Sequence, residues 1–475
     1  MPAREPAIDV RPFSRLLPRR DFCWRGDRTH LRLVLSWLLP NFLRASSQLG
    51  LAAALLAAFS LWCYADFILI PHQQAESERL GIPRGNLSDL YPRWLGTREL
   101  LLHGRDPYSP DVTREIQAGY YGRVLDPGRA NDPKDQQGFA YPIYVAFLLA
   151  PTVTLPFALV QAAFRWLLIA ITALTVPLWF RAVGWRASWP TKATWIILAL
   201  GSFAAVQGIK LQQLTLLVCG LTAAAMVALI GGRLLLAGVL LGLSTIKPQL
   251  VGILILWLAL WTVVDWRSRR RLAYGFLATM FLLVVGGELL LPGWISRFHS
   301  AASAYMQYTG GGKSVLDVLL GAAAGKIAAL LIILGTAIFC WRNRQAQSHD
   351  PKFAWSLALV LGTTLAVAPT YAPYNQLLLL PALMMIAREM PRLWRSGRFL
   401  RAMIFLTSLA VAWSWLSSVL LTLSLPFISR PVLQSAWTMP LAANFFVPLT
   451  VLALSALCAW KVEEQPPQSI PPMGA

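Results

Sequence analysis

The sequence predicts an all-α polytopic membrane protein. Of its 475 residues, 56% are hydrophobic and only 13% are charged, whereas soluble domains are about one quarter charged. The apolar residues also arrive in blocks of about 18 or more, the length that a helix needs to cross a hydrocarbon core of roughly 30 Å. No soluble fold requires so many blocks of this kind.

Twelve apolar segments are predicted to span the membrane. Some are short, as expected where helices are broken or buried inside a bundle. They are residues 48–70, 159–180, 193–209, 211–230, 234–246, 248–265, 272–291, 315–340, 353–369, 375–388, 402–424 and 441–460. A further apolar segment, YPIYVAFLLAPTVTLPF at residues 141–157, is broken by three prolines. It is predicted to form a re-entrant or juxtamembrane hairpin instead of a span.

The distribution of basic residues predicts the orientation, because short cytoplasmic loops carry an excess of Lys and Arg. With residues 141–157 left outside, 26 of the 42 Lys and Arg residues lie on the inner side and 14 on the outer side. Both termini are then cytoplasmic. The predicted organisation is a basic cytoplasmic N-terminus at 1–46, a transmembrane domain at 47–460 that contains a large extracytoplasmic loop at 71–158, and a cytoplasmic tail at 461–475.

This orientation also accounts for the net charge of +20, so no nucleic-acid partner is expected. In the basic N-terminus, Leu31–Phe42 is too short to span and is compatible with an interfacial helix. The five cysteines have no CxxC or CxxH spacing, which indicates neither a disulfide framework nor a metal site. The inner loops lack a GxxxxGK[ST] phosphate-binding pattern. Chemistry is therefore expected on the outer face, with no metal and no cofactor.

One outer stretch, SDLYPRWLGTRELLLHGRDPYSP at residues 88–110, is unusually rich in charged and aromatic residues. Pro92 suits the first turn of a helix, and Gly104 suits its C-terminal cap. Asp89 falls at or just before the start of this helix. Two interpretations of Asp89 remain open: a helix cap, or a general base at the membrane boundary beside Arg93.

The following turn, Gly104 to Tyr108, has strong turn chemistry. Asp106 in this turn is better explained as a turn-former or an arginine partner than as a catalyst. The outer histidines His103 and His299 are better explained as structural hydrogen-bonding groups than as bases. No grouping of His, Asp and Glu in the sequence has the spacing of metal ligands.

Further polar residues interrupt the later apolar segments. Lys210 and Lys247 lie at outer helix ends, where a lysine either extends to the interface or holds a lipid phosphate or diphosphate. Lys247 directly precedes a proline at a break between two spans, which favours the second interpretation. Asn375 and Gln376 begin a late span, where amides bond either a sugar hydroxyl or another helix.

The order of these motifs resembles a known family. After a first span come D-x-x-[Y/P] and LLxGxDPY, then the proline-broken hairpin, QQLTLLV, GRLLLAGVLLGLSTIKPQL and YNQLLLLP. This resembles glycosyltransferase family 87, the polyprenyl-phosphate-mannose-dependent, mannosyltransferase-like membrane proteins of the GT-C superfamily. The resemblance covers about residues 50–390. Two positions depart from it: the family often has Gly-Gln at Gln212-Gln213, and often a histidine near Asn375.

The resemblance implies a GT-C fold whose first outer loop contains juxtamembrane helices and supplies the base that deprotonates the acceptor. By position, that base is Asp89. The lipid tail of the donor would lie in a groove between spans. The GxDPY element shapes the site and corresponds to Arg105, Asp106 and Tyr108. Further candidates for substrate binding are Gln213, Asn375 and Gln376. The cations expected at the leaving phosphate are Lys247, Lys210, Arg93 and Arg297.

The implied function is transfer of a sugar, mannose or another hexose or pentose, from a polyprenyl phosphate to a lipid or glycan acceptor, with inversion. The site would face outward from the plasma (inner) membrane of a bacterium and would serve its cell envelope. The alternative is a transporter or flippase of lipid-linked sugars, which would be expected to show two related halves and ionisable residues near the midplane. A non-catalytic scaffold for envelope assembly is a third possibility.

Overall fold

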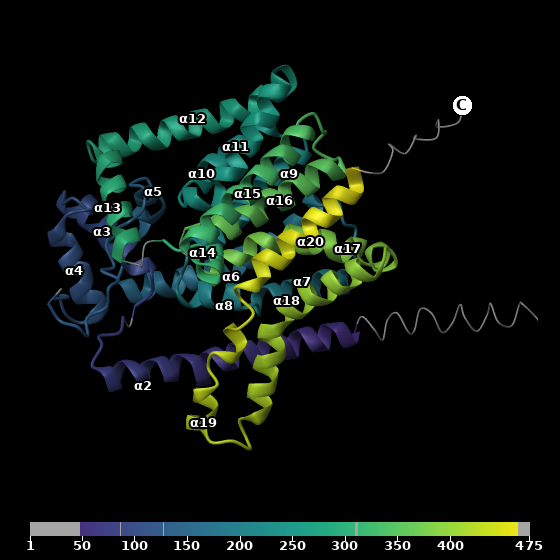
Figure 1. Ribbon diagram of the computed structural model, residues 1–475. Coiled ribbons are helices and arrows are strands. Elements are labelled where there is room, and N and C mark those ends of the chain that lie inside the picture. Colours follow the sequence, from purple (N-terminus) through teal and green to yellow (C-terminus); the bar gives the residue numbers. More distant parts are fainter. Residues whose placement is uncertain (1–47, 86, 127, 309–311, 370, 464–475) are drawn as a thin grey trace, which may run out of the picture. The chain divides into compact units, whose positions relative to one another are not determined.

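The apolar segments of the sequence form helices in the computed structural model, which describes residues 48–463 except 86, 127, 309–311 and 370. Every regular element within these residues is helical (Figure 1). The described residues belong almost entirely to a unit that begins at Gly50. The predicted N-terminal region 1–46, its interfacial helix and residues 464–475 of the predicted tail lie outside the described residues.

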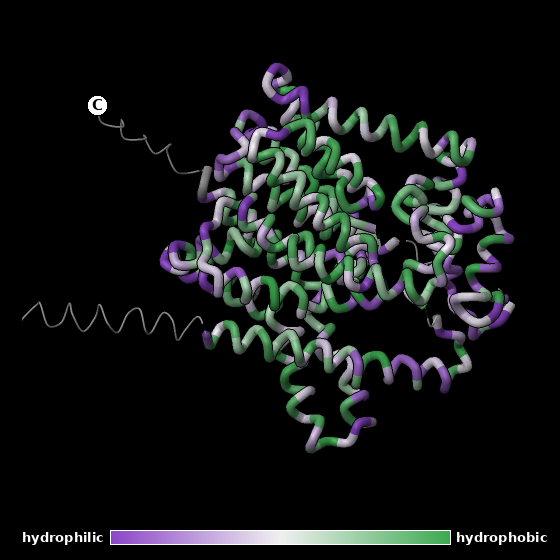
Figure 2. The backbone as a smooth tube through the Cα atoms, turned by 180° about the vertical axis from the view of Figure 1, so that it is seen from behind, coloured by the Kyte–Doolittle hydropathy of each residue, from purple (hydrophilic) through white to green (hydrophobic). Residues whose placement is uncertain are grey.

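Six helices of the described chain are long and apolar enough to cross a membrane. The first, Gln48–Leu80, contains a π-helical turn, η1 (Ala65–Leu69), and ends as α2 (Ile70–Leu80). The others are α6 (Phe157–Ala182), α12 (Trp266–Leu290), α15 (Ala322–Arg342), α18 (Arg398–Ser424) and the segment Arg430–Lys461, which comprises α19 (Arg430–Ser435), η4 (Met439–Leu441) and most of α20 (Phe446–Glu463). Figure 2 shows apolar residues along these helices and hydrophilic residues at many helix ends.

The expected number of twelve spans is not confirmed, because several predicted spans form shorter or broken helices. α7 (Trp189–Leu200) and α8 (Phe203–Lys210) are bent by 54° and count as a seventh span only if they are taken together. A 17-residue helix is roughly 25 Å long, less than the hydrocarbon thickness. The remaining predicted spans correspond to α9 (Thr215–Ile230), α10 (Leu234–Ser244), α11 (Pro248–Val264), α16 (Pro351–Val367) and η3 (Pro373–Leu379) with α17 (Leu380–Arg395).

The segment between the first helix and α6 folds as a separate layer of short helices. It contains α3 (Leu90–His103), α4 (Pro110–Tyr121), α5 (Val145–Leu149) and η2 (Ala150–Thr152). These lie together with α13 (Trp294–Tyr308) at the left of Figure 1. Their buried side chains, among them Leu90, Ile143 and Trp294, share one apolar cluster. As predicted, residues 141–157 form no spanning helix, since the three prolines limit them to short turns.

Two glycines bring α10 and α12 into close contact. A Cβ at Gly238 would lie 2.2 Å from the carbonyl oxygen of Leu272, and a Cβ at Gly275 would lie 2.1 Å from that of Leu235. Small residues allow such close backbone approach between membrane helices, where van der Waals packing drives association. Packing of these two helices therefore requires glycine at both positions.

Gly238→Ala and Gly275→Ala are expected to destabilise the protein by about 1–3 kcal/mol each, because the added methyl would force the backbones apart. The measurement is the thermal unfolding temperature of the purified protein in detergent. Gly252→Ala in α11 is the matched control, since a Cβ there meets nothing within 4 Å. Equal unfolding temperatures for the three variants would contradict this account of the packing.

Candidate active site

The carboxylate of Asp89 lies at the start of α3 and is held by neighbouring backbone and side chains. The Asp89 N–H donates to the carbonyl of Leu211 at 3.1 Å, and Arg93 Nη1 donates to the Asp89 carbonyl at 2.5 Å. The Asp89 side chain makes no capping hydrogen bond to α3. It accepts a hydrogen bond from Nε2 of Gln213 instead. Asp89 is therefore the N-cap residue of α3 by position, as expected, but its side chain does not cap the helix. The carboxylate faces the membrane-embedded helices instead.

Gln213 connects this carboxylate to a buried cation. Its Oε1 accepts a hydrogen bond of 2.6 Å from Nζ of Lys247. A second hydrogen bond, of 2.8 Å, joins the same Nζ to Oγ1 of Thr215. Lys247 is only 6% exposed, and burial of a charge is costly without polar partners. The lysine therefore does not extend to the interface; it points inward, into the polar cluster.

The chain of hydrogen bonds continues from Lys247 to the late helices. Thr215 Oγ1 donates to Oδ1 of Asn375 at 3.1 Å. Thr215 begins α9 and Asn375 lies in η3, so both stand at interruptions of the apolar helices. Asp89, Gln213, Lys247, Thr215 and Asn375 thus form one connected set of side chains from four parts of the chain, which we call the polar cluster.

Tyrosine rings and Arg93 surround the polar cluster. Lys247 Nζ lies 5.0 Å from the centre of the Tyr374 ring and 5.7 Å from that of Tyr141. The Arg93 guanidinium, in a residue that is 9% exposed, lies 4.6 Å from the Tyr141 ring. Both cations therefore face the same aromatic ring, an arrangement stabilised by the ring quadrupole.

A second carboxylate, Asp135, belongs to the loop near this site. It is half-buried, and burial raises its pKa, with the charge of Asp89 raising it further and Arg93 lowering it. Burial likewise raises the pKa of Tyr305, on α13, to about 12. Asp135 accepts hydrogen bonds of 3.0 Å from the backbone N–H and the side chain of Gln137, so its position is fixed by a local turn.

The GxDPY element lies beside the polar cluster and supports it. The Asp106 carboxylate accepts from the Tyr108 N–H at 2.9 Å and pairs with Arg297 of α13. The Tyr108 hydroxyl donates to the Tyr141 carbonyl at 2.6 Å. This element therefore positions Tyr141 through its backbone.

The other predicted residues have partners elsewhere. Lys210 pairs with Asp66 and lies 5.1 Å from the Trp62 ring. Arg105 donates to Glu99 and Glu115 at 2.7 Å each. The amide of Gln376, in contrast to its neighbour Asn375, donates to the Tyr371 hydroxyl and to the Asn444 carbonyl.

The family resemblance singled out Asp89 and Gln213, and the local sequence singled out Arg93, Lys247 and Asn375; the fold brings these five residues together. No roles were assigned from the sequence to Thr215, Tyr305, Tyr374 and Asp135, and Tyr141 appeared only as the first residue of the proline-broken hairpin. The only local signal for two of these is that Tyr374 precedes Asn375 and that Tyr141 opens the proline-broken hairpin. Within the described residues, no group of three or more His, Cys, Asp and Glu side chains is placed to hold a metal ion.

Comparison with known proteins identifies the family. The sequence model of glycosyltransferase family 87 matches residues 139–369. This match supports membership of the chain in glycosyltransferase family 87. The comparisons with curated proteins and with solved structures gave no match.

The family assignment and the six spanning helices identify a membrane glycosyltransferase. The matched segment of this glycosyltransferase contains Tyr141, Gln213, Thr215 and Lys247. Asp89 precedes it and Asn375 follows it. The polar cluster therefore joins residues inside the matched segment to residues on both sides of it.

Gln212, directly before Gln213, has a left-handed backbone conformation. Gln212 has a φ of +47°, a conformation that costs a residue with a Cβ about 1–2 kcal/mol and that glycine adopts freely. It is also the position where the family often has glycine. The turn orients Gln213 toward Asp89 and Lys247, so the left-handed residue serves the polar cluster.

Gln212→Gly is expected to be more stable than Gln212→Ala by about 1 kcal/mol, because both lose the same side chain and only alanine keeps the strain. At Gln207, inside α8, the order should reverse, since glycine weakens a helix. Thermal unfolding of the four variants measures both differences. An alanine variant at 212 as stable as the glycine variant would show that the turn is not strained.

The raised pKa of Asp135 makes the stability of the protein depend on pH. A carboxyl group whose pKa is raised on folding costs stability above its folded pKa, and that cost disappears as the pH falls below the unfolded value of roughly 4. Asp135→Asn is therefore expected to unfold at a higher temperature than the parent at neutral pH, with the difference shrinking as the pH approaches 4. A difference that does not change with pH would contradict the raised pKa.

Proposed function

We propose that this glycosyltransferase moves a sugar from a polyprenyl-phosphate donor to an acceptor hydroxyl, with Asp89 as the general base. The observation that carries the proposal is the pairing of a carboxylate and a buried ammonium on one amide, Asp89–Gln213–Lys247. Transfer from a phosphate-linked sugar needs both a proton acceptor at the nucleophile and positive charge at the leaving group.

The reaction is a single displacement at the anomeric carbon. The acceptor oxygen forms a bond to that carbon while the bond to the phosphate oxygen breaks, and the electron pair leaves with the phosphate. Asp89 takes the acceptor proton. Because attack and departure occur on opposite sides of the carbon, the configuration inverts.

Lys247 and Arg93 are the cations best placed to stabilise the leaving phosphate. Lys247 uses two of its three N–H donors for Gln213 and Thr215, which leaves a third for a phosphate oxygen. Its surroundings exclude water, so its charge acts more strongly on the phosphate than a charge in water does. Lys210 and Arg297, which pair with Asp66 and Asp106, are less suited to this role.

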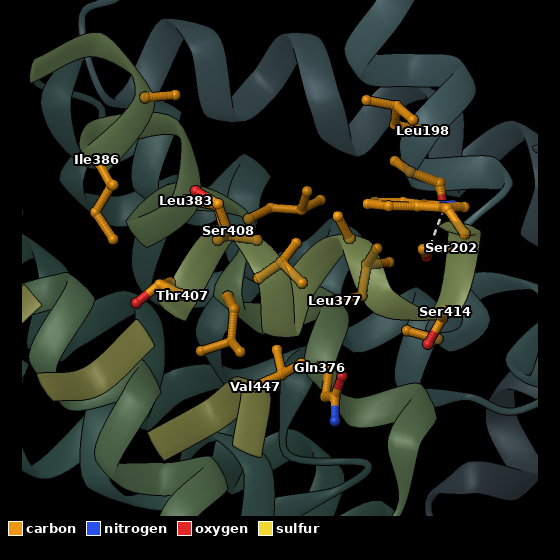
Figure 3. A pocket seen from close by; sticks show the side chains of 18 of the residues that line it. Leu198, Ser202, Gln376, Leu377, Leu383, Ile386, Thr407, Ser408, Ser414 and Val447 are labelled. Carbon is orange, nitrogen blue, oxygen red and sulfur yellow. Dashed lines mark hydrogen bonds between the residues drawn. The ribbon is translucent and has the colours of Figure 1, made fainter. Parts of the chain in front are cut away.

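An apolar groove that Gln376 helps to line supports a lipid-linked donor. It has a volume of about 290 Å³ and lies between α7, α17, α18 and α20. Gln376 and Ser414 lie toward one end of the groove and Ile386 toward the other (Figure 3). Asn375, the residue next to Gln376, bonds to Thr215 in the cluster. A prenyl chain in the groove would therefore bring its phosphate toward Lys247.

The tyrosines around the cluster suit a sugar ring, which stacks on aromatic faces through its C–H groups. Tyr141 and Tyr374 both lie within 6 Å of the Lys247 ammonium. Mannose, or another hexose or pentose, is the proposed sugar, and a lipid or glycan on the outer face of a bacterial plasma membrane is the proposed acceptor. Family membership favours transfer over the transporter, flippase or scaffold alternatives.

Asp89→Asn is expected to reduce transfer by roughly 10²–10⁴-fold, since the amide cannot take the acceptor proton. The assay follows radiolabelled sugar from polyprenyl-phosphate mannose, or from other hexose and pentose donors, into total membrane lipids supplied as the acceptor pool. Asp111→Asn is the matched control, because Asp111 is exposed on α4 and its one ion pair among residues 48–463, as far as these are described, is with Arg114.

The unfolding temperature of each variant shows whether it is folded. Full transfer by folded Asp89→Asn would remove Asp89 as the base. Absence of transfer by the parent protein with every lipid-linked donor, together with transport of the donor across the bilayer, would contradict the proposed function itself.

A further inference from the structure

A cavity lined by basic and apolar side chains lies at the opposite end of α6 from the polar cluster. α6 begins at Phe157, whose ring contacts Tyr91 and Trp94 of the α3 layer. Its 26 residues extend roughly 39 Å. The cavity, of about 680 Å³, lies at the C-terminal end of this helix, from Leu174 around the turn to α7. It is therefore remote from Asp89 and Lys247.

Three cations line this cavity: Arg181, Arg186 and Lys192. No acidic residue lines it, and in the described part of the chain none of the three forms an ion pair or a side-chain hydrogen bond. A neighbouring acid, Glu389, pairs with Arg388, and Arg388 also donates to the Val183 carbonyl at the end of α6. The cavity thus gathers positive charge without a counter-ion.

The local sequence builds this arrangement. α6 ends at Ala182, and Gly184, with a φ of +67°, reverses the chain. The Trp185 ring then packs on Phe180 at 5.0 Å and on Trp195 at 6.0 Å, which forms an aromatic base for the cavity. Ser188 caps α7 by accepting from the Thr191 N–H, so the positive end of that helix dipole lies beside Lys192.

One wall of the cavity is apolar and continues onto the membrane-facing side of α6. Leu174 and Pro177 line it, and the Leu174 side chain is 62% exposed on a candidate membrane span. A free anion would need only the cations. A ligand that uses both the cations and this wall carries a phosphate together with a hydrocarbon chain.

We propose that the cavity binds the phosphate headgroup of an anionic membrane phospholipid, with an acyl chain against Leu174 and Pro177. Basic pockets between membrane helices attract such headgroups because several cations act on one phosphate at the membrane surface. The negative charge of the bound phosphate would offset part of the repulsion among the three cations and stabilise the turn between α6 and α7. This site is independent of the proposed transfer reaction.

The test compares lipid retention and stability in nanodiscs. The site variant Arg181→Gln/Arg186→Gln/Lys192→Gln is measured beside a control variant with the same loss of charge, Arg267→Gln/Arg270→Gln/Arg271→Gln, at exposed positions of α12. The discs contain phosphatidylcholine alone or with phosphatidylglycerol. Native mass spectrometry counts retained phosphatidylglycerol, and thermal unfolding reports its stabilising effect.

The parent and the control variant are expected to retain phosphatidylglycerol and to unfold at a higher temperature in its presence. The site variant should lose at least 10-fold in retention and show no such rise, while unfolding as the parent does in phosphatidylcholine. Should the triple variant fail to fold, Arg186→Gln and Lys192→Gln are measured singly.

Equal losses in the site and control variants would overturn the proposal, since they would indicate diffuse attraction of the basic surface. Unchanged retention in the site variant would overturn it as well. Inorganic phosphate, added to discs of phosphatidylcholine alone, distinguishes the two sources of a phosphate group. If it reproduces the full temperature rise of the parent, the lipid assignment is wrong.

Discussion

The burial of the Lys247 ammonium is the constraint on which the rest of the site depends. A lysine that is 6% exposed among apolar helices requires polar partners, and its partners are Gln213 and Thr215. Gln213 precedes α9, Thr215 is its first residue, and Lys247 precedes α11. The breaks between α8 and α9, and between α10 and α11, therefore meet at one point, together with η3 and the start of α3.

The same constraint links the layer of α3, α4 and α5 to the longer helices. Gln213 can satisfy Lys247 and Asp89 together only if its turn adopts the left-handed backbone at Gln212. The Tyr108 hydroxyl holds the Tyr141 backbone, and the Tyr141 ring faces both Lys247 and Arg93. The family-matched segment, residues 139–369, thus needs α3 before it and η3 after it to complete the polar cluster.

Much of the fold was predictable from sequence, because long apolar runs specify membrane helices almost directly. The helices correspond to the predicted segments. The number of full spans was not predictable, because the length of an apolar run does not show where polar residues will interrupt the helix. Lys247 was recognisable because charge is rare within the apolar segments, and Asp89 because of the family resemblance. Lys210 and Arg297 had the same local signal, but Asp66 and Asp106 lie within reach of them in the folded chain. The spacing of residues along the chain does not show such ion pairs between distant residues. It also does not show that Tyr374 and Asp135 lie near the polar cluster.

The role of Lys247 at the donor phosphate is tested most directly by a structure of the protein with polyprenyl phosphate bound, determined by cryo-electron microscopy in nanodiscs. The account predicts the phosphate within hydrogen-bond distance of Lys247 Nζ, with the prenyl chain in the groove beside Gln376. Ordered phosphate density elsewhere, with Lys247 still bonded only to Gln213 and Thr215, would contradict it.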